Sequence, residues 1–166
     1  MKTEKNLNTI NENQFISLFG SVFEKSEWIA AEAFRKKPFK NSQDLIDKMI
    51  KIYESCSIDQ IIVILNLHPK LAIEKKLTSF STKEQTGAEL DKCSDEELAE
   101  FNRLNFDYEK KFGFPFIIAV KGKNKNEILE NFRGRINNDY EKEFQEAKKQ
   151  VTKIALFRLS EILKTN

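Results

Sequence analysis

The chain has 166 residues, a length that suits one domain with a core large enough to need neither disulfides nor metal. Its 28 basic and 26 acidic residues interleave and give a net charge of +2, a pattern typical of solvated helix faces. No basic patch indicates a nucleic-acid partner, and no stretch is long and apolar enough to cross a membrane. The polar N-terminus has no apolar signal core, so a reduced, cytoplasmic protein is expected.

The first half of the chain carries apolar residues at helical spacing and few turn formers, with 5 Gly and 3 Pro in the whole chain. The spacing predicts helices over residues 12–19 and 25–34. Two more helices are expected after Ser42 and Ser57, because a serine can cap a helix N-terminus. This half therefore predicts helices and no hairpins.

The second half begins with two Ser-x-x-Glu signatures, Ser81 to Glu84 and Ser94 to Glu97. Each predicts a capping box, in which Ser and Glu satisfy exposed amides of the first helical turn. The stretch Phe114–Val120 is expected to be extended, because Pro115 disfavours helix geometry at its predecessor and β-branched residues follow.

Helices are expected again over about residues 126–136 and 139–163. Without an internal repeat or a low-complexity linker, residues 1–166 are predicted to form a single domain. The predicted fold class is therefore all-α, a helical bundle with one short extended segment near Phe114–Val120.

Three polar residues lie where apolar residues are expected. His68, the only histidine, follows Ile61 and Leu65 at helical spacing, so its imidazole continues a buried face just before a proline stops the helix. Arg158 continues a buried stripe of the last helix, where a guanidinium needs an anionic partner or a ligand. Glu84 is the third, near the start of its helix.

Together these residues supply an imidazole that can titrate near neutral pH, a carboxylate and a fixed cation. Such a set suits proton transfer with stabilisation of a developing anion. Each of the three also has a structural explanation. His68 could bond a backbone carbonyl, Glu84 could complete a cap, and Arg158 could pair with a surface carboxylate. One histidine and two distant cysteines do not favour a zinc site, no glycine-rich phosphate loop is present, and nothing pairs Cys93 with His68 as a nucleophile.

Five segments in order carry a family resemblance: HPKLA, STKEQTGAELD, FNRLNFDYEKKFGFPFIIAVKG, ILENFRGRINN and IALFRL. Over about residues 10–163 the chain resembles the OHCU decarboxylases, which act on 2-oxo-4-hydroxy-4-carboxy-5-ureidoimidazoline (OHCU). The resemblance implies an all-helical homodimer without metal or organic cofactor. It implies a carboxy-lyase that converts OHCU to (S)-allantoin and CO₂, the last step from urate, in functional coupling to uricase and hydroxyisourate hydrolase.

The resemblance also implies the site residues. The family's catalytic histidine falls on His68, its arginine on Arg158, and Glu84 is expected to bind the ureido side of the substrate. We expect His68 to manage the proton next to the departing carboxylate and Arg158 to hold an anionic oxygen. The positions expected to bind substrate are Pro69, Ser81, Thr82, Lys83, Glu84, Gln85, Phe116, Ile117, Ile118, Ala119 and Val120.

The chain departs from the family pattern after His68. Lys70 stands where the family often has an acidic residue, Ile73 where a glycine is usual, and the stretch between Ala72 and Ser81 is shorter than typical. We therefore expect this loop to be rebuilt. Two alternatives remain at the level of sequence: a non-catalytic, dimeric helical binding module, and a decarboxylase of a related ureide.

Overall fold

The computed structural model describes residues 7–72 and 77–165. The predicted departure at Ile73 lies outside the described residues, as does part of the shortened loop. The chain divides into two compact units: Met1–Ile64 with Thr152–Asn166, and Leu65–Val151. The single-domain interpretation stays a prediction. Helices are the only regular elements in the part of the chain that is described, which confirms the all-α class.

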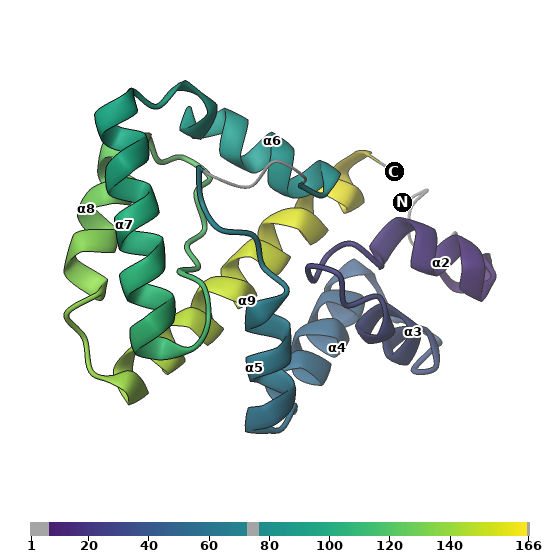
Figure 1. The fold of residues 1–166 in the computed structure, drawn as a ribbon. Coiled ribbons are helices and arrows are strands. Elements are labelled where there is room, and N and C mark those ends of the chain that lie inside the picture. Colours follow the sequence, from purple (N-terminus) through teal and green to yellow (C-terminus); the bar gives the residue numbers. More distant parts are fainter. Residues whose placement is uncertain (1–6, 73–76, 166) are drawn as a thin grey trace. The chain divides into compact units, whose positions relative to one another are not determined.

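The described part of the first unit contains α2 (Glu12–Phe19), α3 (Trp28–Phe34), α4 (Ser42–Glu54) and most of α5 (Ile58–Asn66), joined by the end of α9 (Tyr140–Thr165) (Figure 1). Aromatic rings form the centre of this unit. The Phe15 ring lies 4.8 Å from Phe19, 5.5 Å from Phe34 and 5.7 Å from Phe39, measured between ring centroids. The predicted helices over 12–19 and 25–34 are confirmed, the second beginning at Trp28.

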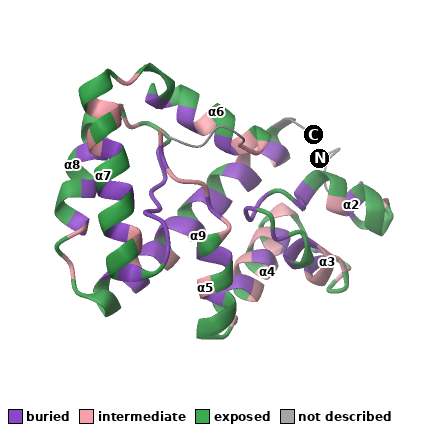
Figure 2. Cartoon of the chain, viewed as in Figure 1, coloured by how far each residue is buried: buried purple, intermediate pink, exposed green. Residues whose placement is uncertain are grey.

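The second unit contains α6, a 3₁₀ turn, α7, α8 and the first part of α9 (Figure 1). Their bounds are α6 (Ser79–Gly87), η1 (Leu90–Lys92), α7 (Asp95–Phe112), α8 (Lys125–Arg135) and α9 (Tyr140–Thr165). Tyr108 and Phe116 lie in its core, where Phe132 stacks on Phe116 at 3.9 Å between centroids. Residues 115–120 have neither helical nor strand pairing, and all five residues from Phe116 to Val120 are buried (Figure 2).

The predicted helix caps are partly right. The Ser94–Glu97 capping box is present, and α7 ends at Gly113, whose φ of 76° is the left-handed conformation that glycine favours. The predicted Ser81–Glu84 capping box is wrong, because α6 begins three residues earlier and Thr78 is its N-cap, with the Thr78 hydroxyl accepting from the Ser81 amide. Likewise, Asn41 and not Ser42 caps α4. In both cases a capping residue shortly before the predicted one takes the role.

Candidate active site

His68 lies two residues beyond the end of α5. The helix ends at Asn66, and the His68 amide donates to the Leu65 carbonyl at 3.2 Å. Pro69 follows, and a proline has no N–H with which to continue a helix. Because His68 is 8 % exposed, it continues the buried face of α5 as predicted, while an edge of the residue remains accessible.

Five consecutive predicted binding residues lie in the first two turns of α6. Ser81 and Gln85 are buried, Glu84 is half-buried, and Thr82 and Lys83 are exposed. Since Ser81 and Gln85 are four residues apart, they share the inner face of the helix. Glu84 lies at the edge of that face. The roles of these five residues in binding stay predictions.

Gln85 joins α6 to the segment that follows His68. The Gln85 side-chain oxygen accepts from the Ala72 amide at 3.0 Å, and its nitrogen donates to the Lys70 carbonyl at 3.4 Å. Ala72 has a φ of 66°, a left-handed conformation that is unfavourable for a residue with a Cβ. The helix that carries Glu84 is thereby bonded to the loop that carries His68.

The extended segment is held by side chains from two helices. Arg135 Nη1 donates to the Ile117 carbonyl at 2.7 Å, and the Ala119 amide donates to Gln150 Oε1 at 2.9 Å. The Arg135 guanidinium also lies over the Phe116 ring, 4.4 Å from its centroid. The buried backbone of this predicted binding segment therefore has a defined orientation.

A buried polar cluster behind this segment was missed by the sequence interpretation. Glu143, which is fully buried, accepts from the Tyr108 hydroxyl and from Arg135 Nε at 2.8 Å, and Asn138 Nδ2 donates to its other oxygen at 2.9 Å. Burial, followed by the bond to Glu143, raises the pKa of Tyr108, so its hydroxyl remains a donor. Arg135, Asn138 and Glu143 lie close together in the sequence, around the start of α9, but Tyr108 lies 35 positions before Glu143, so only tertiary structure completes the cluster.

Arg158 is buried in the first unit, as its position in the apolar stripe predicted. Its Nη1 lies 3.1 Å from Glu24 Oε2 and donates to the Ser21 and Val22 carbonyls at 3.2 and 3.3 Å. Arg158 is 2 % exposed and Glu24 is 1 % exposed. The anionic partner expected from the sequence is therefore Glu24, and the guanidinium has one fixed orientation. An additional role in substrate binding stays a prediction.

The environment of Cys93 does not favour a role as a nucleophile. Burial, followed by the nearby Glu97 carboxylate, raises the pKa of the Cys93 thiol, which disfavours the thiolate that a nucleophile needs.

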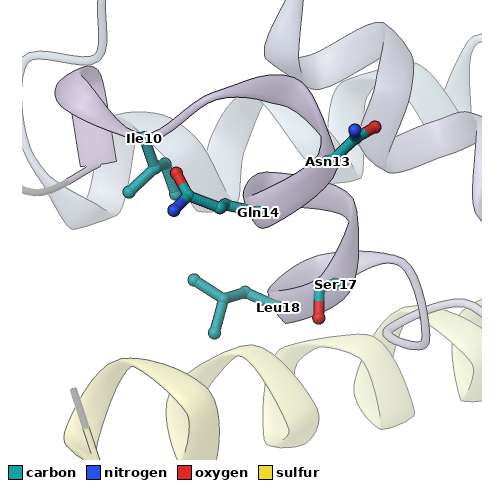
Figure 3. A pocket seen from close by; sticks show the side chains of 5 residues that line it. All are labelled: Ile10, Asn13, Gln14, Ser17 and Leu18. Carbon is teal, nitrogen blue, oxygen red and sulfur yellow. The ribbon is translucent and has the colours of Figure 1, made fainter.

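A surface hollow of about 490 Å³ is lined by Ile10, Asn13, Gln14, Ser17 and Leu18 of the α2 region, and none of these is a predicted site residue (Figure 3). Among the described residues, no helix is long and apolar enough to cross a membrane.

The comparisons with known proteins agree with the resemblance. Residues 8–160 match the family model described as OHCU decarboxylase. A 2-oxo-4-hydroxy-4-carboxy-5-ureidoimidazoline decarboxylase of Haloferax volcanii is 34 % identical over 96 % of this chain and 95 % of its own length. The chain belongs to the OHCU decarboxylase family.

Two of the proteins that this chain resembles are longer, and a third is of similar length. A uric acid degradation bifunctional protein of Bacillus sp. (strain TB-90) is 39 % identical over 96 % of the chain, which spans 32 % of that relative. A crystal structure of (S)-allantoin synthase superposes with a TM-score of 0.75 at 30 % identity, covering 96 % of this chain and 53 % of the other. An OHCU decarboxylase crystallised in the presence of (S)-allantoin shares the fold, with a TM-score of 0.73 at 24 % identity, over 93 % of this chain and 99 % of the other.

Proposed function

We propose that the chain is a lyase that decarboxylates OHCU to (S)-allantoin and CO₂. The observation that carries the proposal is the position of His68, a single, almost buried imidazole at a helix end, in a chain of the OHCU decarboxylase family. A relative named as this decarboxylase aligns with this chain over nearly the full length of both proteins.

The proposed reaction needs one proton acceptor that later becomes a proton donor. The bond from C4 to its carboxylate breaks and releases CO₂. Its electron pair forms a C=C bond to the carbon that bears the ureido group, and the electrons of the ring C=N pass to the ring nitrogen, which takes up a proton from water. The enol that results loses the proton of its 4-hydroxyl and gains a proton on the carbon that bears the ureido group. His68 takes the first proton and delivers the second to one face, because one imidazole can do both near neutral pH. Delivery to one face gives a single enantiomer.

In this proposal several groups of the second unit help to orient the substrate. The half-buried Glu84 carboxylate accepts hydrogen bonds from the ureido N–H groups. In an extended chain, neighbouring residues direct their backbone polar groups to opposite sides. The Ile117 carbonyl and the Ala119 amide are bonded to Arg135 and Gln150, so Ile118 presents its amide and carbonyl on the other side, where they suit the alternating donors and acceptors of the ring.

We further propose the finer properties that the resemblance implies. The protein is a cytoplasmic homodimer that binds neither nucleic acid nor membranes, and it is functionally coupled to uricase and hydroxyisourate hydrolase. The similarity to a uric acid degradation bifunctional protein supports the pathway. Pro69, Ser81, Thr82 and Lys83 would line the site, and Arg158 would hold an anionic oxygen. These roles are expected from the family motif.

The test uses OHCU generated freshly from urate by uricase and hydroxyisourate hydrolase. The protein is added, and the circular dichroism of allantoin is followed over time. Because OHCU decays unaided to racemic allantoin, an enzyme must exceed that rate and give one hand. Fast formation of dextrorotatory (S)-allantoin is expected. Racemic product at the background rate from a folded sample would overturn the proposal and favour a non-catalytic module or a different ureide.

A further inference from the structure

The segment around His68 is bonded along one face of α7 and its C-cap. The three pairs are Asn66 Nδ2 to the Gly113 carbonyl at 3.1 Å, Lys70 Nζ to Glu109 Oε2 at 2.8 Å, and Asn105 Nδ2 to the Leu71 carbonyl at 3.2 Å. The α7 partners are four residues apart, so they lie on one face of the helix. As the segment advances, its partners step backwards along α7. The loop therefore runs antiparallel to the helix, with His68 between bonded positions on either side.

These contacts differ in how strongly they can hold the loop. Lys70 and Glu109 are 34 % and 42 % exposed, and an ion pair of such accessibility holds its partners weakly. Asn105 is only 3 % exposed, and Gln85 is 7 % exposed. Hydrogen bonds from buried amides to backbone groups are protected from water, so Asn105 and Gln85 carry most of the restraint.

Asn105 is an unusual choice for the buried face of α7. Its nitrogen donates to the Leu71 carbonyl, but no donor among the described residues reaches its buried oxygen. A half-satisfied buried amide is less favourable for stability than an apolar side chain of similar size. Local rules that are broken in this way mark functional positions more often than purely structural ones.

We infer that Asn105 and Gln85 are positioning residues that fix the loop Lys70–Ala72 and, through it, the imidazole of His68. Asn105 bonds the middle of this loop, and Gln85 bonds both of its ends. The inference rests on the proposed function to the extent that His68 is the catalytic residue. Gln85 is also expected, from the family motif, to contact substrate. The inference gives it a second role, in which its side-chain oxygen and nitrogen both bond the loop.

The kinetic test compares Asn105→Ala with Asn102→Ala, the same change at an exposed position of the same helix. A displaced catalytic group lowers turnover by on the order of 10- to 100-fold. We expect Asn105→Ala to lower kcat by about that factor with little change in KM, because it removes positioning and not substrate binding. Asn102→Ala should behave as the unchanged protein. Equal kcat values for the two variants would overturn the inference.

Gln85 gives a second pair of variants that decides the matter if Asn105→Ala does not fold. Gln85→Glu keeps the oxygen that accepts from Ala72 but loses the donor to Lys70, whereas Gln85→Ala loses both. We expect kcat to fall more in Gln85→Ala than in Gln85→Glu. A rise in KM with unchanged kcat in both would assign Gln85 to substrate binding alone and contradict the positioning role.

A measurement without substrate separates this inference from the proposed function. Because the chain has one histidine, an untagged sample gives one imidazole Cε1–H correlation in a ¹H–¹³C NMR spectrum. Its position and its titration should change in Asn105→Ala and Gln85→Ala, and stay the same in Asn102→Ala. An unchanged His68 signal in folded variants would overturn the positioning role even if OHCU is turned over. A changed signal in a protein that does not turn over OHCU would uphold the positioning role and reject the function.

Discussion

Arg158 and Glu24 form an ion pair in which both side chains are almost completely buried. Removing one member leaves the other as an uncompensated buried charge, at a cost of about 3–5 kcal/mol in unfolding free energy. Arg158→Met should show this loss in urea unfolding, and Arg158→Met with Glu24→Met should lose less than the sum of the single changes. Arg35→Met is the control, because the Arg35–Glu32 pair is exposed.

The kinetics of Arg158→Lys test the predicted substrate role. Lysine keeps the charge but cannot reproduce the planar geometry of the guanidinium. If Arg158 holds an anionic oxygen, we expect Arg158→Lys to raise KM markedly while it lowers the melting temperature only a little. A large loss of stability with unchanged kinetics would instead make the arginine purely structural.

Tyr108 gives a prediction about stability in the second unit. Tyr108→Phe removes one donor from the fully buried Glu143 carboxylate and should lower the unfolding free energy by about 1–3 kcal/mol. Tyr140→Phe, the same change at a tyrosine that is 46 % exposed, should have little effect. Thermal unfolding followed by circular dichroism compares the two, and equal melting temperatures would contradict the role given to the Tyr108 hydroxyl.

For single residues, the sequence predicted whether a side chain is buried more reliably than it predicted which residue the side chain bonds. The spacing of Ile61, Leu65 and His68 was enough to predict a buried imidazole, and the same reasoning predicted a buried Arg158. Glu24 as its partner could not be predicted, because it lies 134 positions away and only tertiary structure brings it close. The positioning contacts of Asn105 depend on a loop path that no periodicity encodes.

At the scale of one helix, the start of α7 links pH to stability. Hydrogen bonds donated by the Lys125 side chain and by the Ser94 amide hold the pKa of Glu97 below its ordinary value of 4.5. Since the folded-state pKa is the lower one, this contribution is present above the ordinary value and is lost as pH falls through the folded-state pKa. We expect Glu97→Gln to lower the melting temperature at pH 7. We also expect the melting temperature of this variant to fall less as the pH is lowered.

The control is Glu130→Gln at an exposed position of α8, which should keep the acid dependence of the unchanged protein. Melting temperatures from pH 7 to pH 3 give the comparison. A parallel pH dependence for Glu97→Gln and the unchanged protein would show that the α7 cap does not contribute to acid sensitivity.

The sequence predicted which segments form helices more reliably than it predicted the residue at which each helix begins. The start of α7 was predicted correctly, because Ser94 and Glu97 form a complete capping box. The start of α6 was not, because Thr78 precedes Ser81 and offers an equally good hydroxyl three residues earlier. The extended segment was predicted from Pro115, but its restraint by Arg135 and Gln150 depends on the packing of α8 and α9.

At the scale of the whole molecule, helical periodicity predicted the fold class but not the division into two compact units. The division falls within α5 and within α9, where the sequence has no linker or change in composition. A boundary inside a helix depends on which residues pack together, and local patterns do not record that. The assignment to the family, in contrast, needed only the order of several short motifs.

The central claim is that this fold decarboxylates OHCU through its one imidazole. The most direct measurement compares the unchanged protein with His68→Gln in the circular dichroism assay for (S)-allantoin, with far-ultraviolet spectra of both samples. We expect an intact helical spectrum and a loss of roughly 10²–10⁴-fold in turnover, the usual contribution of a general acid–base group. Retained stereospecific turnover in a folded His68→Gln sample would contradict the claim, because no other histidine could replace it.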